Sequence, residues 1–129
     1  MAAAYTCAMS EDERFTIGHH DEFERSGNWS LARRSLGLRS FGMNLVEIAP
    51  GERIPEHDET GRDQEEVFVI LEGSPSVLID GETHATRAGT FVRLDPEPSR
   101  TVVKTGDEPA LVLIVSAPRS SGYEAMDWA

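Results

Sequence analysis

The sequence predicts an all-β protein built as a sandwich or barrel. Short apolar runs recur along the chain and are separated by turns that contain Gly or Pro, a rhythm typical of such folds. Asp80-Gly81 lies between two of these runs, which indicates a tight hairpin. No segment keeps a helical apolar pattern over three turns. The chain has 129 residues, which suits one domain with one core.

Each strand is placed by an apolar run and ended by a turn. The β-like pattern begins at Trp29, and the turn at residues 50–51 closes its first part. In the clearest strand, Glu66, Phe68 and Ile70 share one face. The expected strands cover residues 31–38, 41–49, 66–71, 77–79, 83–87, 90–94, 100–104 and 111–116. The residues expected to be largely buried are Phe68, Ile70, Leu94, Val102 and Leu113.

These patterns divide the chain into three parts. Residues 1–28 are polar, acidic and weakly patterned, so we expect an N-terminal arm. Residues 29–118 form the expected barrel, and residues 119–129 form a loop-like C-terminal tail. His19 and His20 would point in different directions on a strand or helix, so a solvated segment is favoured over a shared metal site.

Composition narrows the classes of partner. With 23 acidic and 12 basic residues the formal net charge is −11, which opposes binding to nucleic acid or to an anionic membrane. The single cysteine, Cys7, rules out an internal disulfide and fits a reducing compartment. No apolar run is long enough to span a bilayer, and residues 1–9 make a poor secretory signal. We therefore expect a cytoplasmic protein that interacts with neither nucleic acid nor membrane.

The sequence has one cluster of basic residues, made of Arg33, Arg34 and Arg39. Arginines at alternating strand positions in an acidic protein are favoured as surface ion-pair partners. Recognition of an anion is the alternative, if one of them turns into the barrel.

Residues 50–73 carry the most informative motif. Gly51 is followed after five residues by His57, and Glu66 is followed after six by Gly73. This order resembles the first motif of the cupin family. In that motif a second histidine follows two residues after the histidine that corresponds to His57. Glu59 stands at that place, and the spacer to Glu66 is about two residues longer than is common. The resemblance covers roughly residues 41–116 and implies a double-stranded β-helix, a jelly-roll barrel that often holds a metal ion.

The second motif of the family keeps its spacing here but changes its residues. Counting from Gly89, Arg100 takes the place of the last histidine ligand, and Lys104 takes the place of an asparagine. A guanidinium offers only hydrogen-bond donors, so it cannot bind a metal. Opposite Glu59 and Glu66 it would instead supply positive charge. We therefore expect a metal-free centre with no cofactor.

The expected site consists of His57 as the catalytic proton-transfer group and Glu59, Glu66, Arg100 and Phe68 as ligand-binding residues. Arg100 would hold an anionic or enolate-like oxygen, and Phe68 would line the pocket below Glu66. A divalent metal on His57, Glu59 and Glu66 is the less favoured alternative. A further alternative places residues 57–59 on a solvated loop with no site at all.

Three functions follow from the resemblance. The leading one is a small-molecule-binding cupin that catalyses an isomerisation, epimerisation or cyclisation by acid–base chemistry. The second is a metal-dependent oxygenase or isomerase, and the third is a ligand-binding module without chemistry. The family commonly pairs two barrels, so we expect a homodimer to which the N-terminal arm contributes.

Overall fold

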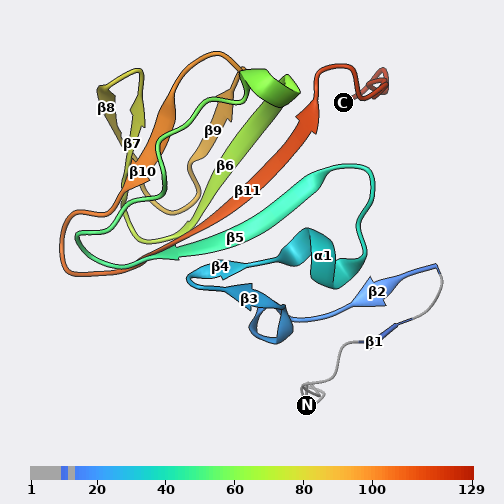
Figure 1. The fold of residues 1–129 in the computed structure, drawn as a ribbon, viewed down its shortest axis with the longest axis horizontal. Coiled ribbons are helices and arrows are strands. Elements are labelled where there is room, and N and C mark those ends of the chain that lie inside the picture. Colours follow the sequence, from blue (N-terminus) through green and yellow to red (C-terminus); the bar gives the residue numbers. More distant parts are fainter. Residues whose placement is uncertain (1–9, 12–13) are drawn as a thin grey trace.

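Two antiparallel sheets face each other and enclose the core in this computed structural model, which describes residues 10–11 and 14–129 (Figure 1). The large sheet has the strand order β3, β4, β5, β11, β6, β9, and the small sheet has the order β10, β7, β8. The strands are β1 (Ser10–Glu11), β2 (Thr16–Ile17), β3 (Arg25–Ser26), β4 (Trp29–Ser30), β5 (Gly42–Ile48), β6 (Gln64–Glu72), β7 (Ser76–Ile79), β8 (Glu82–Ala85), β9 (Phe91–Leu94), β10 (Arg100–Val103) and β11 (Ala110–Pro118). The predicted all-β jelly-roll barrel is confirmed. Cys7 lies outside the described residues.

An extended segment continues the small sheet on the far side of β10. His57 and Arg100 exchange two backbone hydrogen bonds, of 3.0 and 2.8 Å, and form an antiparallel bridge. Arg53 forms a second bridge with Val103, and the Ile54 amide donates to the carbonyl oxygen of Val102 at 3.1 Å. The segment that carries His57 is therefore fixed to the strand that carries Arg100.

The core lies between the sheets and is made of alternate strand residues. Phe68, Ile70, Leu94 and Val102 are buried as predicted. Leu113 is only half-buried and faces the outer side of the large sheet, because the inward residues of β11 are Ala110, Val112 and Ile114. The prediction for Leu113 was wrong because both faces of this strand are apolar, so alternation could not select the inner one.

Two turns show why glycine stands where it does. Asp80 and Gly81 have φ angles of 50° and 79° and join β7 to β8 in a two-residue hairpin, as predicted. Gly73 has a φ of 81°, and a Cβ atom there would lie 2.6 Å from the carbonyl oxygen of Pro109. The end of β6 therefore packs directly on the backbone that leads into β11.

The outer face of the large sheet is partly covered by the chain's own N-terminal residues. The predicted strand at 31–38 was wrong: helix α1 (Ala32–Leu36) occupies this segment and ends at Gly37, with a φ of 71°. Ala32 and Phe23 pack with Leu45 in a second apolar cluster. The sheet begins at Arg25, before the predicted barrel start at Trp29, because β3 pairs with β4. The remaining short elements are the 3₁₀ turns η1 (His20–Glu22) and η2 (Thr60–Arg62).

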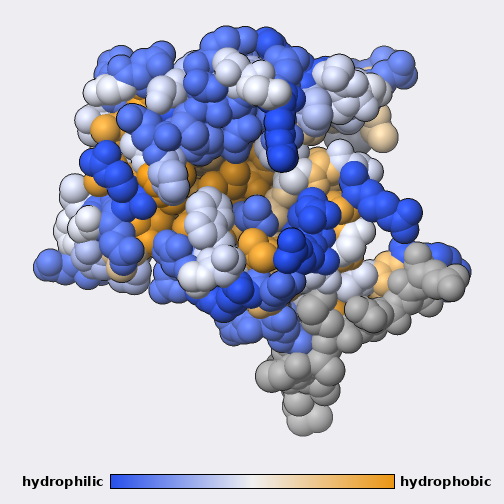
Figure 2. Space-filling model, in the orientation of Figure 1, coloured by the Kyte–Doolittle hydropathy of each residue, from blue (hydrophilic) through white to orange (hydrophobic). Residues whose placement is uncertain are grey.

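Figure 2 shows apolar residues across the middle of one face of the molecule, with hydrophilic residues on both sides of them. The C-terminal residues 119–129 contain no helix or strand, and Tyr123, Met126 and Trp128 are exposed. None of the described helices is long and apolar enough to cross a membrane.

Candidate functional site

The site forms where one end of the large sheet meets the segment that runs beside β10. Glu66 lies near the start of β6 and points to the inner face, with Phe68 and Ile70 below it. His57 reaches the same region through its bridge to Arg100. The backbone amide of Glu59 donates to the carbonyl oxygen of Pro96 at 2.9 Å, which fixes the third residue.

The imidazole and two carboxylates converge on one point. His57 Nε2 lies 3.2 Å from Glu59 Oε1 and 3.7 Å from Glu66 Oε1. The side chains are increasingly buried along this series, with 34% of His57, 21% of Glu59 and 7% of Glu66 exposed. The three residues that the sequence grouped together therefore meet in space, and the alternative of a solvated loop does not describe them.

The tautomer of His57 determines whether Nε2 faces the Glu59 and Glu66 carboxylates as a hydrogen-bond donor or as an acceptor. Its Nδ1 lies 2.9 Å from the carbonyl oxygen of Pro55, which can only accept a hydrogen bond, so Nδ1 carries a proton and donates it there. In a neutral imidazole, Nε2 would then be an acceptor that faces two carboxylate oxygens. Such acceptors repel one another unless a proton or another cation lies between them. The space between His57 Nε2 and the two carboxylate oxygens therefore suits a proton or a metal ion.

Arg100 lies behind Glu66 and has no exposed side-chain surface. Its Nη1 is 3.6 Å from Glu66 Oε1, and its Nη2 donates to the carbonyl oxygen of Asp95. Arg100 Nε, Arg100 Nη1 and Glu66 Oε1 have no hydrogen-bond partner. The guanidinium thus points to Glu66 as the alignment predicted, and it compensates a buried carboxylate at a longer distance than a hydrogen bond.

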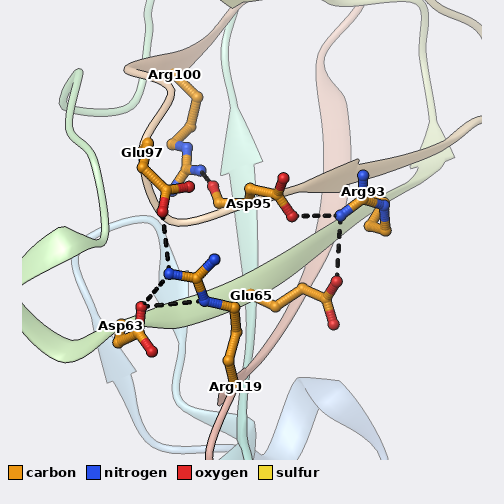
Figure 3. A network of polar contacts seen from close by, with 7 residues as sticks. All are labelled: Asp63, Glu65, Arg93, Asp95, Glu97, Arg100 and Arg119. Carbon is orange, nitrogen blue, oxygen red and sulfur yellow. Dashed lines mark hydrogen bonds and ion pairs between the residues drawn. The ribbon is translucent and has the colours of Figure 1, made fainter.

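A network of exposed ion pairs braces the turn that leads into β10 (Figure 3). Arg93 bridges Glu65 at 3.2 Å and Asp95 at 2.5 Å, and Asp95 also accepts the hydrogen bond from Arg100. Arg119, just after β11, bridges Asp63 at 2.5 Å and Glu97 at 3.0 Å. Exposed pairs contribute little one by one, but together these contacts join the start of β6 to the turn that positions Arg100.

A pocket of about 390 Å³ opens beside the three converging residues. The other side chains around it come from β4, η2, the starts of β5 and β6, and the end of β11. The lining residues are Trp29, Gly42, Met43, Asn44, His57, Glu59, Arg62, Gln64, Glu66, Ile114 and Ser116. Phe68 and Arg100, expected to touch a ligand, are fully buried and do not line this pocket.

Sequence reasoning missed several of the lining residues. Gln64 precedes Glu66 by two positions on β6, so the alternation that placed Glu66 inward extends to it. Arg62 gave no such signal, because it lies in the long spacer between the two motif carboxylates. That spacer folds as η2, ends at Asp63 with a φ of 51°, and returns the chain to the pocket.

Burial raises the pKa of the Glu66 carboxyl above its ordinary value of 4.5, and the nearby Glu59 carboxylate adds to the rise. His57 and Arg100 act in the opposite direction without cancelling it. Asp58 differs, because hydrogen bonds from the side chain and backbone of Thr60 lower its pKa. Asp58 therefore accepts hydrogen bonds from Thr60 at the start of η2, while Glu66 is the one of these two carboxyls that holds a proton more readily.

This pKa gives a prediction for stability. Between 4.5 and the raised pKa of Glu66, the folded protein binds more protons than the unfolded chain, so the contribution of Glu66 to stability falls as pH rises. Glutamine does not titrate. The free energy of unfolding of Glu66→Gln, minus that of the parent, should therefore increase from pH 4.5 upward and then level off. Urea denaturation of both proteins at several pH values, with a chelator present, measures this difference in the free energy of unfolding. A decrease across this range would show that Arg100 and His57 outweigh burial.

The comparisons with known proteins agree with the fold and the motifs. A family model described as a cupin domain matches residues 44–116, more than half of the chain. The chain belongs to the cupin family. A search of curated proteins found no match.

Solved structures of other cupins share this fold. A cupin protein from Bacteroides fragilis has a TM-score of 0.67 and 25% identity, over 74% of this chain and 80% of its own. A Cupin 2 conserved barrel domain protein from Salinispora arenicola has a TM-score of 0.57 and 25% identity, over 64% and 67%. A cupin-superfamily sugar phosphate isomerase from Silicibacter pomeroyi has a TM-score of 0.61 and 24% identity, over 70% and 60%. At such identity the last likeness shows the fold alone.

Cupins often bind a metal, and the residues of this centre fit one. His57 Nε2 and one carboxylate oxygen from each of Glu59 and Glu66 lie within 4.8 Å of one another. One imidazole and two carboxylates suit a hard or borderline divalent ion. The hydrogen bond from Nδ1 to Pro55 orients the ring as partners of metal-binding histidines do, and Glu66 Oε1 has no hydrogen-bond partner.

Proposed function

We propose that this cupin binds a small molecule beside His57 and moves a proton within it, as in an isomerisation, epimerisation or cyclisation. The observation that carries the proposal is the convergence of His57 Nε2 with two carboxylate oxygens, at 3.2 and 3.7 Å, beside an open pocket. A proton held between an imidazole and a carboxylate can pass to and from a ligand. The centre needs no metal for this chemistry, because Arg100 places positive charge beside Glu66.

The chemical step is a proton transfer at a carbon next to a carbonyl group. With the shared proton on Glu66, whose pKa is raised, Nε2 of His57 is free to act as the base. It removes the proton, and the electron pair of the broken C–H bond moves into the carbonyl, which becomes an enolate. The imidazolium formed lies beside the Glu59 carboxylate, which stabilises its charge. The proton then returns to a carbon of the same ligand. Arg100 acts as a positioning residue in this scheme, because it contacts Glu66 and does not line the pocket.

Exchange of hydrogen for deuterium tests the proton transfer. The protein is incubated in D₂O with a panel of small keto acids, hydroxy acids and sugar phosphates, and NMR follows the loss of C–H signals. We expect exchange with at least one compound, reduced about 100-fold or more in His57→Gln. His84→Gln is the matched control, since His84 is exposed on β8. Binding without exchange in the whole panel would favour a ligand-binding module and contradict the proposed chemistry.

A metal-dependent cupin is the second candidate, favoured by the three donors within 4.8 Å of one another. A bound divalent ion would supply a Lewis acid that polarises a ligand oxygen. Elemental analysis of freshly purified protein separates the two candidates. About one equivalent of metal per chain, lost in Glu66→Gln, would support the second. Full exchange activity in metal-free protein would support the first.

The homodimer and the cytoplasmic location stay predictions. Light scattering of the protein before and after removal of residues 1–24 tests the expected contribution of the N-terminal arm to a dimer.

A further inference from the structure

We propose that a second subsite beside this centre binds a phosphate group, so that the ligand is a phosphorylated small molecule. The inference rests on the proposed function, because the reacting part of the same ligand would lie against His57. It is carried by a pocket of about 370 Å³ that adjoins the first one and has the opposite charge.

The two pockets adjoin each other. They share lining residues from the start of β5, from η2, from the start of β6 and from β11. The shared residues are Gly42, Met43, Asn44, Arg62, Gln64 and Ser116. These elements converge at one end of the large sheet, near the turn that precedes β6 (Figure 1). A single ligand can therefore reach from the carboxylates of the first pocket into the second.

Charge distinguishes the second pocket. Arg33, Arg39 and Arg62 line it, and no Asp or Glu lies among its described lining residues. This is unusual in a chain with 23 acidic and 12 basic residues. Three guanidinium groups around one hollow, without a carboxylate between them, make a site for an anion.

Other arginines of this chain pair with carboxylates, whereas those of the second pocket do not. Arg34, next to Arg33 on α1, pairs with Glu24 at 3.2 Å, and Arg93 and Arg119 each bridge two carboxylates. Within residues 10–11 and 14–129, Arg33, Arg39 and Arg62 form no ion pair. Arg33 instead donates to the carbonyl oxygen of Leu38 at 3.4 Å, which holds it beside the loop after α1. The positive charge of these three side chains remains for a ligand.

The number and type of donors favour phosphate over carboxylate. A guanidinium presents donors in a planar fork that matches the oxygens of a phosphate group. Three such cations match a dianionic phosphate ester better than a singly charged carboxylate. Ser40, Asn44 and Ser116 add hydroxyl and amide donors to the same lining.

Inorganic phosphate is the probe that tests this site in the full chain. Calorimetric titration at pH 7.5 and constant ionic strength gives the dissociation constant, and amide NMR shifts at Gly42, Asn44 and Ser116 report the place of binding. We expect Arg33→Gln/Arg39→Gln/Arg62→Gln to weaken phosphate binding at least 10-fold. Arg34→Gln is the matched control and should change it less than twofold. Acetate, titrated in the same way, should bind at least fivefold more weakly than phosphate.

The outcomes separate this inference from the proposed function. Equal phosphate binding by the triple variant and the parent would overturn the subsite, and acetate binding as tight as that of phosphate would overturn the choice of phosphate. His57→Gln should lose proton exchange and keep its affinity for phosphate. Loss of phosphate binding in the triple variant, with no exchange in any compound, would retain the subsite and reject the proposed chemistry. Circular dichroism of each variant checks that the exposed substitutions leave the fold intact.

Discussion

Arg100→Ala should destabilise the protein by about 3–5 kcal/mol, the usual cost of removing one member of a buried ion pair. The side chain has no exposed surface, and its Nη1 lies 3.6 Å from Glu66 Oε1. Its loss leaves the Glu66 carboxylate buried without a nearby arginine and removes the hydrogen bond to Asp95. Urea denaturation of the purified variant and parent measures the change in the free energy of unfolding.

Arg93→Ala is the matched control for Arg100→Ala. Arg93 also pairs with carboxylates, those of Glu65 and Asp95, but its side chain is 61% exposed. An ion pair as exposed as this one contributes little to stability. The two arginines should therefore differ by several-fold in their effect on stability, although both form ion pairs.

A double-mutant cycle tests whether Glu66 is the reason for the cost. Arg100→Met/Glu66→Gln removes both charges, and replacing a buried pair by uncharged groups of similar size is often nearly neutral. The loss of stability in the double variant should be smaller than the sum of the losses measured for Arg100→Met and for Glu66→Gln alone. Additive effects, or an Arg100→Ala variant that melts like the parent, would show that the arginine does not compensate Glu66.

The fold was predictable because its signals are local. The dipeptide Asp80-Gly81 marks a hairpin that the structure shows with the expected two-residue loop. Alternation along β6 placed Glu66, Phe68 and Ile70 on the inner face. The same reasoning failed at residues 31–38, where a single helical turn is too short to show a period. It also failed at Leu113, which lies on a strand with two apolar faces.

The spacing of the family motifs predicted where in the fold a site residue lies, but not where its side chain points. Counting from Gly89 put Arg100 at the position of a histidine ligand, opposite Glu59 and Glu66, and in the structure its Nη1 lies 3.6 Å from Glu66 Oε1. Counting could not show that the guanidinium lies behind Glu66, because the direction of a long side chain depends on packing. Motif spacing also could not predict that Arg39 and Arg62 line the same pocket, because both lie outside the helices and strands that periodicity predicts.

Glu59→His together with Arg100→His should create a centre that binds divalent metal more tightly than the parent does. Residues 57 and 100 are bridge partners on antiparallel strands, so their side chains leave the sheet on the same side. A histidine at 100 would therefore face His57, and a histidine at 59 would take the place of the carboxylate now 3.2 Å from His57 Nε2. With Glu66, the centre would offer three imidazoles and one carboxylate, a set suited to zinc, nickel or iron.

The melting temperature with and without metal measures this gain. A ligand at 100 times its dissociation constant stabilises the folded state by about 2.7 kcal/mol, which raises the melting temperature of a domain of this size by roughly 10 °C. Each variant is compared with itself in chelator, so the stability lost with Arg100 does not enter the result. The two single variants should respond less than the double variant, and adding Glu66→Gln should reduce its response. A double variant that melts at the same temperature with zinc and with chelator would show that position 100 does not face the centre. An equal rise in the parent would show that His57, Glu59 and Glu66 already hold a metal.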